Sequence, residues 1–467
     1  RRPHHRRPGG RIRLPAAGWV PPPPRAAAPR PPSRATASSS SRAPRSGTRC
    51  ASVPPGTERA TSDRSSDSLI TRVYVPIETK YLVAAIPGRD GGHMVTAVRH
   101  LGPNWYATVM GTAVVATAGA TLPVGVPGLR TVCAAVWALS LALLLTLLVA
   151  RALHWRHHRD QARAHLLDPA TAPFYGCLAM ALLAVGGGAL SVGRDWIGLG
   201  AALALDAVLF TAGTVVGLAA AVAVPYLMAV RHRVEPRQAT PVWLLPLVAP
   251  MVSAALGPPL VPYLPPGQPR ETLLLGCVAL FGLSLFATLL MLPLVFARLV
   301  TGGPLPLVLT PTLFLVLGPL GQSTTAVGKF ADVAPGVVPA PYGEGFGLLA
   351  VLYGVPVMGF ALLWLVFATA HVVRARRDGM RFAMTWWAFT FPVGTCVTGA
   401  EALAHRLGLF VYGWLAVALY VVLVAAWATA ALHTVRGLVS GELLAGPRPA
   451  RVVLASTTVR TRSDAVR

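Results

Sequence analysis

The chain has 467 residues, of which 54% are hydrophobic and only 12% are charged, and its mean hydropathy is +0.57. Soluble domains carry about 25% charged residues, so this composition excludes an ordinary soluble protein and favours one embedded in a lipid bilayer. The net charge of +24 would suit nucleic acid, but residues 1–93 hold 17 Lys and Arg against 5 Asp and Glu. Half of the excess charge therefore belongs to one terminal segment, and we expect no nucleic-acid partner.

This N-terminal segment differs from the rest of the chain. Residues 1–68 are rich in Arg, Pro, Ser and Ala, and they show no apolar period. Such a segment cannot bury enough surface to offset its ordering entropy, so we predict a disordered tail over residues 1–100. The first methionine is Met94. Two interpretations stay open: a natural basic extension, or sequence translated from a wrongly assigned start.

The remainder divides into a membrane domain, 101–440, and a cytoplasmic C-terminal tail, 441–467. Long apolar stretches recur through the membrane domain, and a bilayer core needs about 20 apolar residues for each helical span. The sequence therefore predicts an all-α integral membrane protein with ten transmembrane helices. The predicted spans are 104–122, 129–150, 173–193, 203–230, 242–263, 271–297, 305–324, 346–370, 382–405 and 410–435.

Charge in the loops between these spans predicts their orientation. The loops after spans 2, 4 and 8 each hold three or four arginines, whereas the opposite loops hold about one basic residue each. Cytoplasmic loops carry the excess of Lys and Arg, so both termini are expected in the cytoplasm and the chain in the plasma membrane. The spans also pair into hairpins with short outer turns.

Known catalytic and metal-binding patterns are absent from the sequence. The five cysteines stand alone, without metal-ligand or redox spacing, and the His154–His158 cluster lacks carboxylate or cysteine partners. Neither a nucleotide-binding loop nor a hydrolase motif is present. We therefore expect no metal, no cofactor and no enzymatic activity.

Residues that disturb helices gather in the odd-numbered spans, beside neutral hydrogen-bond donors. A proline frees a backbone carbonyl, which a membrane tolerates only where protein or water satisfies it, so we predict bent inner helices around a conduit. Hydroxyls and backbone N–H groups can stabilise an anion without trapping it. The alternative for a single Ser or Thr is a bond to its own helix. The candidate pore-lining residues are Gly111, Thr112, Pro250, Gly318, Pro319, Gln322, Ser323, Thr390 and Pro392.

Two acids lie within predicted spans, where ionisable groups are costly and are commonly functional. Asp206 falls in the first half of span 4, and Glu401 precedes His405 by four residues in span 9, on the same helix face. One interpretation makes Glu401, His405 and Asp206 proton-coupling groups. The other, which we favour for Glu401 and His405, is an ion pair at the membrane interface.

Four stretches together resemble one known family. GPNWYATVMGTAVVA in span 1, VWLLPLVAPMVSAALGPPL in span 5, LGPLGQSTTAVGKF in span 7 and TWWAFTFPVGTCVTGAEALA in span 9 are similar to the tellurite-resistance/dicarboxylate transporter family. This family includes slow-type anion channels, malate permeases and sulfite efflux pumps. The resemblance covers residues 100–436, and GPLGQS is closest to the sulfite-efflux branch.

The resemblance implies five helical hairpins around a central pore, with three subunits in an assembly. It also implies that a phenylalanine of span 9 plugs the pore. The matching residue is Phe391, just before Pro392, and Phe389 is the competing choice. The implied cargo is a small anion: sulfite, a C4-dicarboxylate such as malate, chloride, or an oxyanion related to tellurite.

The sequence thus predicts transport of small anions through a central pore gated by a phenylalanine. Three alternatives stay open. A proton-coupled exporter of another small solute would need an essential acid at depth. A membrane-embedded enzyme would need converging His, Asp or Glu residues near one interface. A sensory membrane protein would use the N-terminal tail as its signalling arm.

Overall fold

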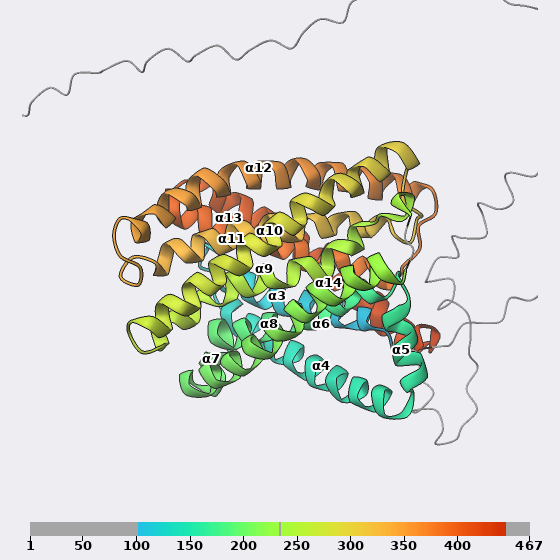
Figure 1. Cartoon of the computed structure of the whole chain (residues 1–467), viewed down its shortest axis with the longest axis horizontal. Helices are drawn as coiled ribbons and strands as arrows, with labels where there is room; N and C mark the ends of the chain where they lie inside the picture. Colours follow the sequence, from blue (N-terminus) through green and yellow to red (C-terminus); the bar gives the residue numbers. More distant parts are fainter. Residues whose placement is uncertain (1–100, 233–234, 445–467) are drawn as a thin grey trace, which may run out of the picture. The chain divides into compact units, whose positions relative to one another are not determined.

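The computed structural model describes residues 101–232 and 235–444, and over these residues the chain is helical throughout, with one isolated β-bridge between Pro335 and Val338 (Figure 1). The predicted N-terminal tail, 1–100, and residues 445–467 of the predicted C-terminal tail, 441–467, lie outside the described residues. Each of the ten predicted spans coincides with helical residues. The expectation of an all-α chain is therefore confirmed for the described part.

The helices form two groups that alternate along the chain. The inner group is α3 (Tyr106–Ala120), α6 (Tyr175–Gly188), α9 (Leu244–Leu256), α11 (Leu317–Val333) and α13 (Phe391–Leu407). The outer group is α4 (Leu129–His157), α8 (Leu199–Val230), α10 (Gln268–Gly302), α12 (Tyr342–Arg377) and α14 (Phe410–Val439). Two short helices, α5 (Arg159–Leu167) and α7 (Arg194–Ile197), lie in the connections after α4 and before α8.

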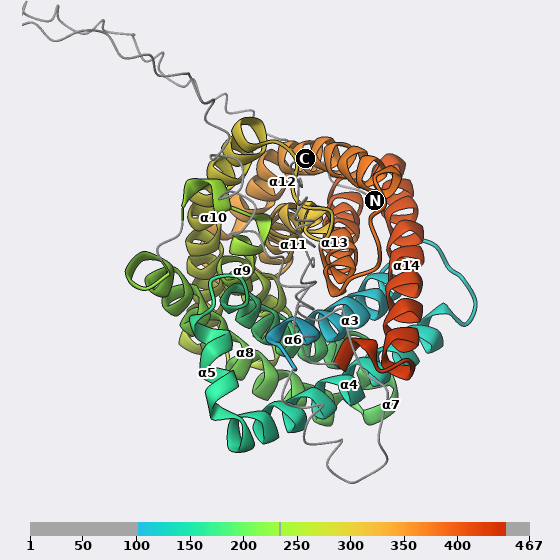
Figure 2. The same cartoon turned by 90° about the vertical axis from the view of Figure 1, so that its right-hand side faces the viewer.

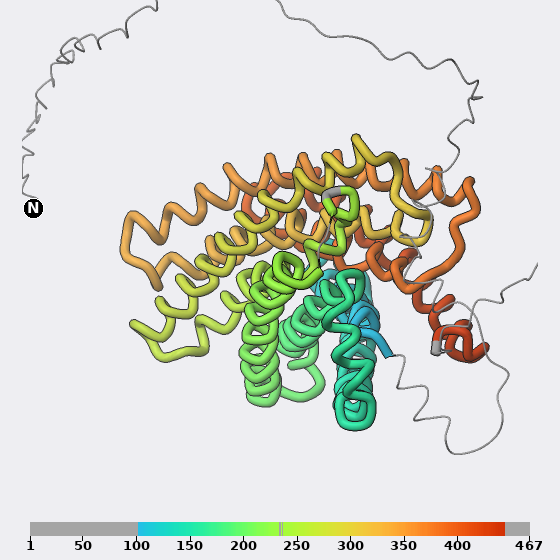
Figure 3. The backbone as a smooth tube through the Cα atoms, turned by 45° about the vertical axis from the view of Figure 1, so that its right-hand side comes forward, coloured from blue at the N-terminus to red at the C-terminus, as the bar shows by residue number. Residues whose placement is uncertain are grey.

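The inner helices form a closed ring. Each contacts the next in the order α3, α6, α9, α11 and α13, and α13 returns to contact α3. Every outer helix packs behind the inner helix that precedes it and also touches the next inner helix (Figure 2). The tube in Figure 3 follows these inner helices as they turn back into the long outer helices. The five predicted hairpins are thus present, arranged around one axis.

The inner and outer helices differ in how far their side chains are buried, as expected for a protein in a bilayer. Within residues 101–232 and 235–444, six helical segments are long and apolar enough to cross a membrane: the five outer helices, and α6 with its flanking turns over Ala172–Ile197. The outer helices expose large apolar side chains such as Leu290 and Phe286, whereas the inner helices are buried on nearly all sides. Exposed apolar faces on long helices suit contact with lipid, so the chain is a multi-pass membrane protein.

Each inner helix begins with an irregular helical turn. A 3₁₀ segment precedes each of them: η1 (Pro103–Trp105), η2 (Ala172–Phe174), η5 (Pro241–Trp243), η7 (Thr310–Val316) and η8 (Met384–Phe389). Four of the five carry proline in their first two positions. Proline suits a helix start, because its missing N–H would have no partner there. The sequence analysis missed this five-fold repeat of a proline or threonine followed closely by an aromatic residue.

The prolines act differently from the prediction that they bend the inner helices. Pro392 is the second residue of α13, so it marks a change from 3₁₀ to α-helix. Of the inner helices only α9 holds an interior proline, Pro250, whereas three outer helices hold Pro225, Pro293 and Pro356. The inner elements are instead broken by 3₁₀ segments and by a π-helical segment, η3 (Ala189–Gly193).

Glycines allow the inner helices to touch through their backbones. A Cβ atom on Gly321 of α11 would lie 2.5 Å from the backbone nitrogen of Cys396 in α13. A Cβ on Gly176 of α6 would lie 2.5 Å from the carbonyl carbon of Leu245 in α9. Both contacts are with backbone, which cannot rotate out of the way, so these positions have room only for glycine.

We expect Gly321→Ala to lower the thermal stability of the protein in detergent, because the added methyl must push α11 from α13. Overpacking of this kind costs about 1–3 kcal/mol or more. The control is Gly282→Ala in α10, where a Cβ meets nothing within 4 Å. An unfolding temperature that falls equally in both variants would contradict a close α11–α13 contact.

Candidate functional site

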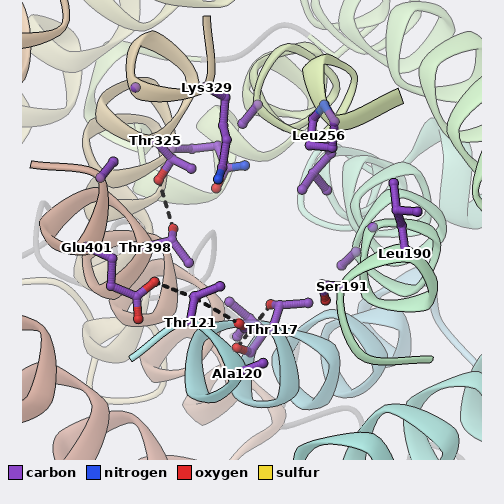
Figure 4. Close-up of a pocket in the computed structure, with 18 of the residues that line it drawn as sticks. Thr117, Ala120, Thr121, Leu190, Ser191, Leu256, Thr325, Lys329, Thr398 and Glu401 are labelled. Carbon is purple, nitrogen blue, oxygen red and sulfur yellow. Dashed lines mark hydrogen bonds between the residues drawn. The ribbon is translucent and has the colours of Figure 1, made fainter. Parts of the chain in front are cut away.

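A cavity of about 540 Å³ lies at the centre of the inner ring (Figure 4). It is lined by residues of all five inner helices, mostly in their C-terminal halves or in the turns directly after them, and by Arg130 and Asp206 of the outer helices. Since the same half of each helix faces it, the inner helices run in the same direction. Lining residues recur every three or four positions on one helix face, as in Gln322, Thr325, Lys329 and Asp332 of α11.

Phe391 lies at the deep end of this cavity. Its side chain is 4% exposed and stands at the first residue of α13. Val114 of α3 and Val252 of α9 also line the cavity. Phe389, the competing gate residue, does not line it and packs edge-on against Phe314, with ring centroids 4.8 Å apart. Of the two candidate gate residues, Phe391 therefore lines the cavity and Phe389 does not.

Neutral polar groups follow on the wall beyond Phe391. The hydroxyls of Thr325 and Thr398 lie 2.8 Å apart, and either can donate to the other. Thr325 also donates to the carbonyl oxygen of Gly321 at 3.0 Å. The buried side chain of Gln322 lies on the same face of α11, one turn before Thr325. Thr398, which the sequence analysis did not select, thus joins a site whose only sequence signal is its spacing from Phe391.

The other predicted pore-lining residues are buried between helices and do not line this cavity. The hydroxyls of Thr112, Ser323 and Thr390 each donate to a carbonyl three or four residues earlier, at 2.7, 3.0 and 2.7 Å. This is the local alternative that the sequence had left open. The remaining members of the set are also buried and outside the cavity lining: Gly111, Pro250, Gly318, Pro319 and Pro392.

The three predicted proton-coupling residues all reach the cavity wall. Asp206 comes from the outer helix α8, and Glu401 and His405 from α13. One carboxylate oxygen of Glu401 accepts a 2.6 Å hydrogen bond from the Thr121 hydroxyl, and its other oxygen has no partner among the described residues. The favoured ion pair of Glu401 with His405 is therefore not the arrangement found.

Glu401 also lies between two cavities. A second cavity, of about 460 Å³, shares Thr121, Glu401 and His405 with the first and extends toward the start of α14. There it is bordered by Phe410 and Trp414, which are largely exposed. The hydrogen bond between Thr121 and Glu401 lies where the walls of the two cavities meet.

Charged residues surround the mouth of the central cavity. Arg130 at the start of α4 pairs with Asp195 of α7 at 2.5 Å, and Arg406 pairs with Asp332 at 2.8 Å. Lys329 lies 4.0 Å from the same Asp332 carboxylate. Exposed pairs of this kind contribute only about 0–1 kcal/mol each to the free energy of unfolding. Their main effect here is on the electrostatic potential at the mouth of the cavity. The mouth is basic overall, while the wall below it is neutral or acidic.

No group of three or more His, Cys, Asp or Glu residues in the described part of the chain could hold a metal ion. His154 and His165 bring their rings to 5.5 Å from each other near α5, far along the chain from the cavity-lining helices. The chemistry that the cavity offers is hydrogen bonding and charge.

We expect a water-soluble thiol reagent to label Thr398→Cys and Thr117→Cys, because both positions line the cavity. Thr112→Cys, buried at 1% exposure, should resist labelling. Cys133, Cys177, Cys277 and Cys396 are buried, so they make a quiet background once Cys50 is replaced by serine. Labelling of all three new cysteines at one rate would contradict the boundary of the cavity.

Sequence comparison shows which known proteins this chain is similar to. The sequence model of the SLAC1 family, described as a voltage-dependent anion channel, matches residues 100–435. An uncharacterised transporter of Methanocaldococcus jannaschii is 26% identical over 352 residues, covering 75% of this chain and 96% of that protein. The sulfite efflux pump of Arthroderma otae is 27% identical over 344 residues, covering 71% and 89%. That of Trichophyton rubrum is 28% identical over 323 residues, covering 66% and 83%.

Proposed function

Because the chain belongs to the SLAC1 family of voltage-dependent anion channels, we propose that it carries small anions through the centre of its inner helix ring. One observation supports this proposal above the others. A single cavity touches all five inner helices and ends at Phe391. A water-accessible space that stops at one aromatic side chain has the form of a closed pore with an apolar gate.

The wall suits an anion that passes without being trapped. Hydroxyls and the Gln322 amide offer neutral donors near the gate, and lysine and arginine are confined to the mouth. Full charges deep in a low-dielectric pore would hold an anion too tightly for rapid release. Basic residues at the entrance would instead raise the local anion concentration.

The placement in the membrane is part of the same proposal. All ten spans cross the bilayer. The inner helices are shorter than the outer ones, and each crosses together with the 3₁₀ segment that precedes it. Arginine-rich loops mark the cytoplasmic side, so the cavity opens outward at the plasma membrane and both termini are inside. By resemblance to the wider family, three subunits assemble, each with its own pore.

Sulfite is the first cargo to test. Two of the relatives named above are sulfite efflux pumps, and both align over most of their length. C4-dicarboxylates, chloride and oxyanions related to tellurite remain the other candidates. A second candidate function, proton-coupled export of a small solute, is favoured by Asp206 and Glu401, which both line the cavity.

We expect Phe391→Ala to increase anion conductance in planar bilayers, because it removes the apolar ring that excludes water from the pore. Lowering the barrier by only about 1.4 kcal/mol would raise the conductance about tenfold. Phe389→Ala is the matched control, since Phe389 packs on Phe314 outside the cavity. Equal currents in the Phe391 variant and the wild type would exclude this gate.

We expect proteoliposomes containing the wild-type protein to take up sulfite, and Thr398→Val to slow that uptake. The valine keeps the shape of threonine but removes one of the two hydroxyls that lie 2.8 Å apart on the wall. Thr429→Val in α14 is the control, because that hydroxyl donates only to its own helix, at Ala425. Parallel assays with malate, chloride and nitrate identify the cargo, and uptake of none of the four would end the proposal.

A further inference from the structure

Asp206 occupies an unusual position. It belongs to the outer helix α8, yet its side chain forms part of the wall of the central cavity. The residue is 1% exposed, and neither carboxyl oxygen has a hydrogen-bond partner among the described residues. An ionised carboxylate without partners is too costly at such a place, so the group must hold a proton or have a route to solvent.

A glycine of α6 lies directly against this carboxyl. A Cβ atom on Gly186 would lie 2.7 Å from Oδ1 of Asp206, so the carboxyl occupies the space that a side chain would take. The next residue, Gly187, lines the cavity. The carboxyl therefore reaches the cavity wall beside a stretch of α6 that carries no side chains.

The same part of α6 is irregular. The π-helical segment η3 starts directly after Gly188, and such segments often occur at functional sites. The indole of Trp137, from α4, donates to the carbonyl oxygen of Val185 at 3.0 Å and packs against Gly188 and Gly193. A helix with three successive glycines and a π turn can shift locally more easily than a regular one.

Charged groups on the neighbouring elements do not reach Asp206. Helices α6 and α9 present glycines and apolar side chains to this part of the wall. The charged or titratable groups on the rest of the wall are Arg130, Arg194, Tyr263, Lys329, Asp332, Glu401 and His405. Asp195 of α7 is paired with Arg130. Within the described residues, no hydrogen bond or ion pair joins any of them to Asp206, so a proton is its only available counter-charge.

We propose that Asp206 is a proton-binding site that makes anion passage depend on pH, with α6 at its glycine triplet as the movable wall. This inference rests on the proposed anion pore and adds a second ligand to it. When α6 covers the carboxyl, Asp206 holds one proton on an Oδ atom and is neutral. When α6 moves, that proton passes to water in the cavity and leaves a carboxylate behind.

The sign of the pH effect follows from this charge. Neutral Asp206 leaves the cavity open to anions, whereas the carboxylate repels them. A unit charge acting at about 10 Å through an effective dielectric of about 20 changes anion occupancy roughly tenfold. Flux should therefore be high at acidic pH and should fall as pH rises through the titration of Asp206.

Nitrate flux into proteoliposomes between pH 5 and pH 8 tests the proposal, because nitrate does not change its own charge over this range. The wild type should lose flux as pH rises, roughly tenfold across the range. Asp206→Asn keeps the shape of the side chain without its charge, and its flux should stay high and flat. Glu344→Gln, at the exposed start of α12 and outside the cavity, should keep the wild-type fall, which controls for the loss of one acidic charge. A wild-type pH profile in Asp206→Asn would overturn the proposal.

Control variants distinguish a protein that does not fold from a protein that folds but lacks the expected pH dependence. Thr214→Val removes a polar group elsewhere on α8, where it bonds Ser253 at 2.9 Å, and should keep the wild-type profile. If Asp206→Asn does not insert, Gly186→Ala takes its place, because its methyl meets the carboxyl and should shift the pH midpoint. Gly200→Ala, where a Cβ meets nothing within 4 Å, should not. Equal midpoints in both alanine variants would overturn the proposal, whereas absence of nitrate flux in every protein would overturn the pore itself.

Discussion

The structure depends on close backbone contact between the inner helices. Lipid gives helices little hydrophobic reason to associate, so packing must hold them together, and packing is tightest where two backbones meet. Gly321 against Cys396 and Gly176 against Leu245 are such places. They fix the radius of the ring, and the radius decides that the centre holds a cavity of about 540 Å³ instead of a solid core. Long outer helices then shield this short, irregular inner layer from lipid, which is why 3₁₀ and π segments are tolerated within it.

The cavity wall carries apolar, neutral polar and charged side chains, and these occupy separate parts of it. Apolar Phe391 lies at one end, neutral donors follow, and the full positive charges lie at the mouth. The acids are the exception to this gradient, since a carboxylate would oppose the cargo. Asp206 lies behind α6 without a partner, and Glu401 is bonded to Thr121. In the proposed pore, the wall would accept an anion best when these acids hold their protons, so the charge of the wall would depend on the pH of the medium.

Sequence alone revealed more of the fold than of the site. Long apolar stretches predicted ten spans that all coincide with helical residues, because this pattern follows from the bilayer and is local in the chain. Phe391, Gln322, Glu401, His405 and Asp206 reach the cavity, but Thr112, Ser323 and Thr390 bond to their own helices. Composition cannot distinguish these cases, since the rotation of each helix depends on contacts with distant segments. Thr398 was missed for the same reason, and Pro392 proved to start a helix instead of bending one.

The common direction of the five inner helices has an electrical consequence. Each α-helix carries a macrodipole equivalent to about half a positive charge at its N-terminus and half a negative charge at its C-terminus. Five parallel helices therefore place their negative ends around the mouth of the cavity and their positive ends beyond Phe391. The antiparallel outer helices oppose this field at long range but lie farther from the axis. Arg130, Arg194, Lys329 and Arg406 stand where the negative ends would otherwise repel an arriving anion. In the proposed pore, the aligned backbone dipoles past that rim would draw an anion down the axis.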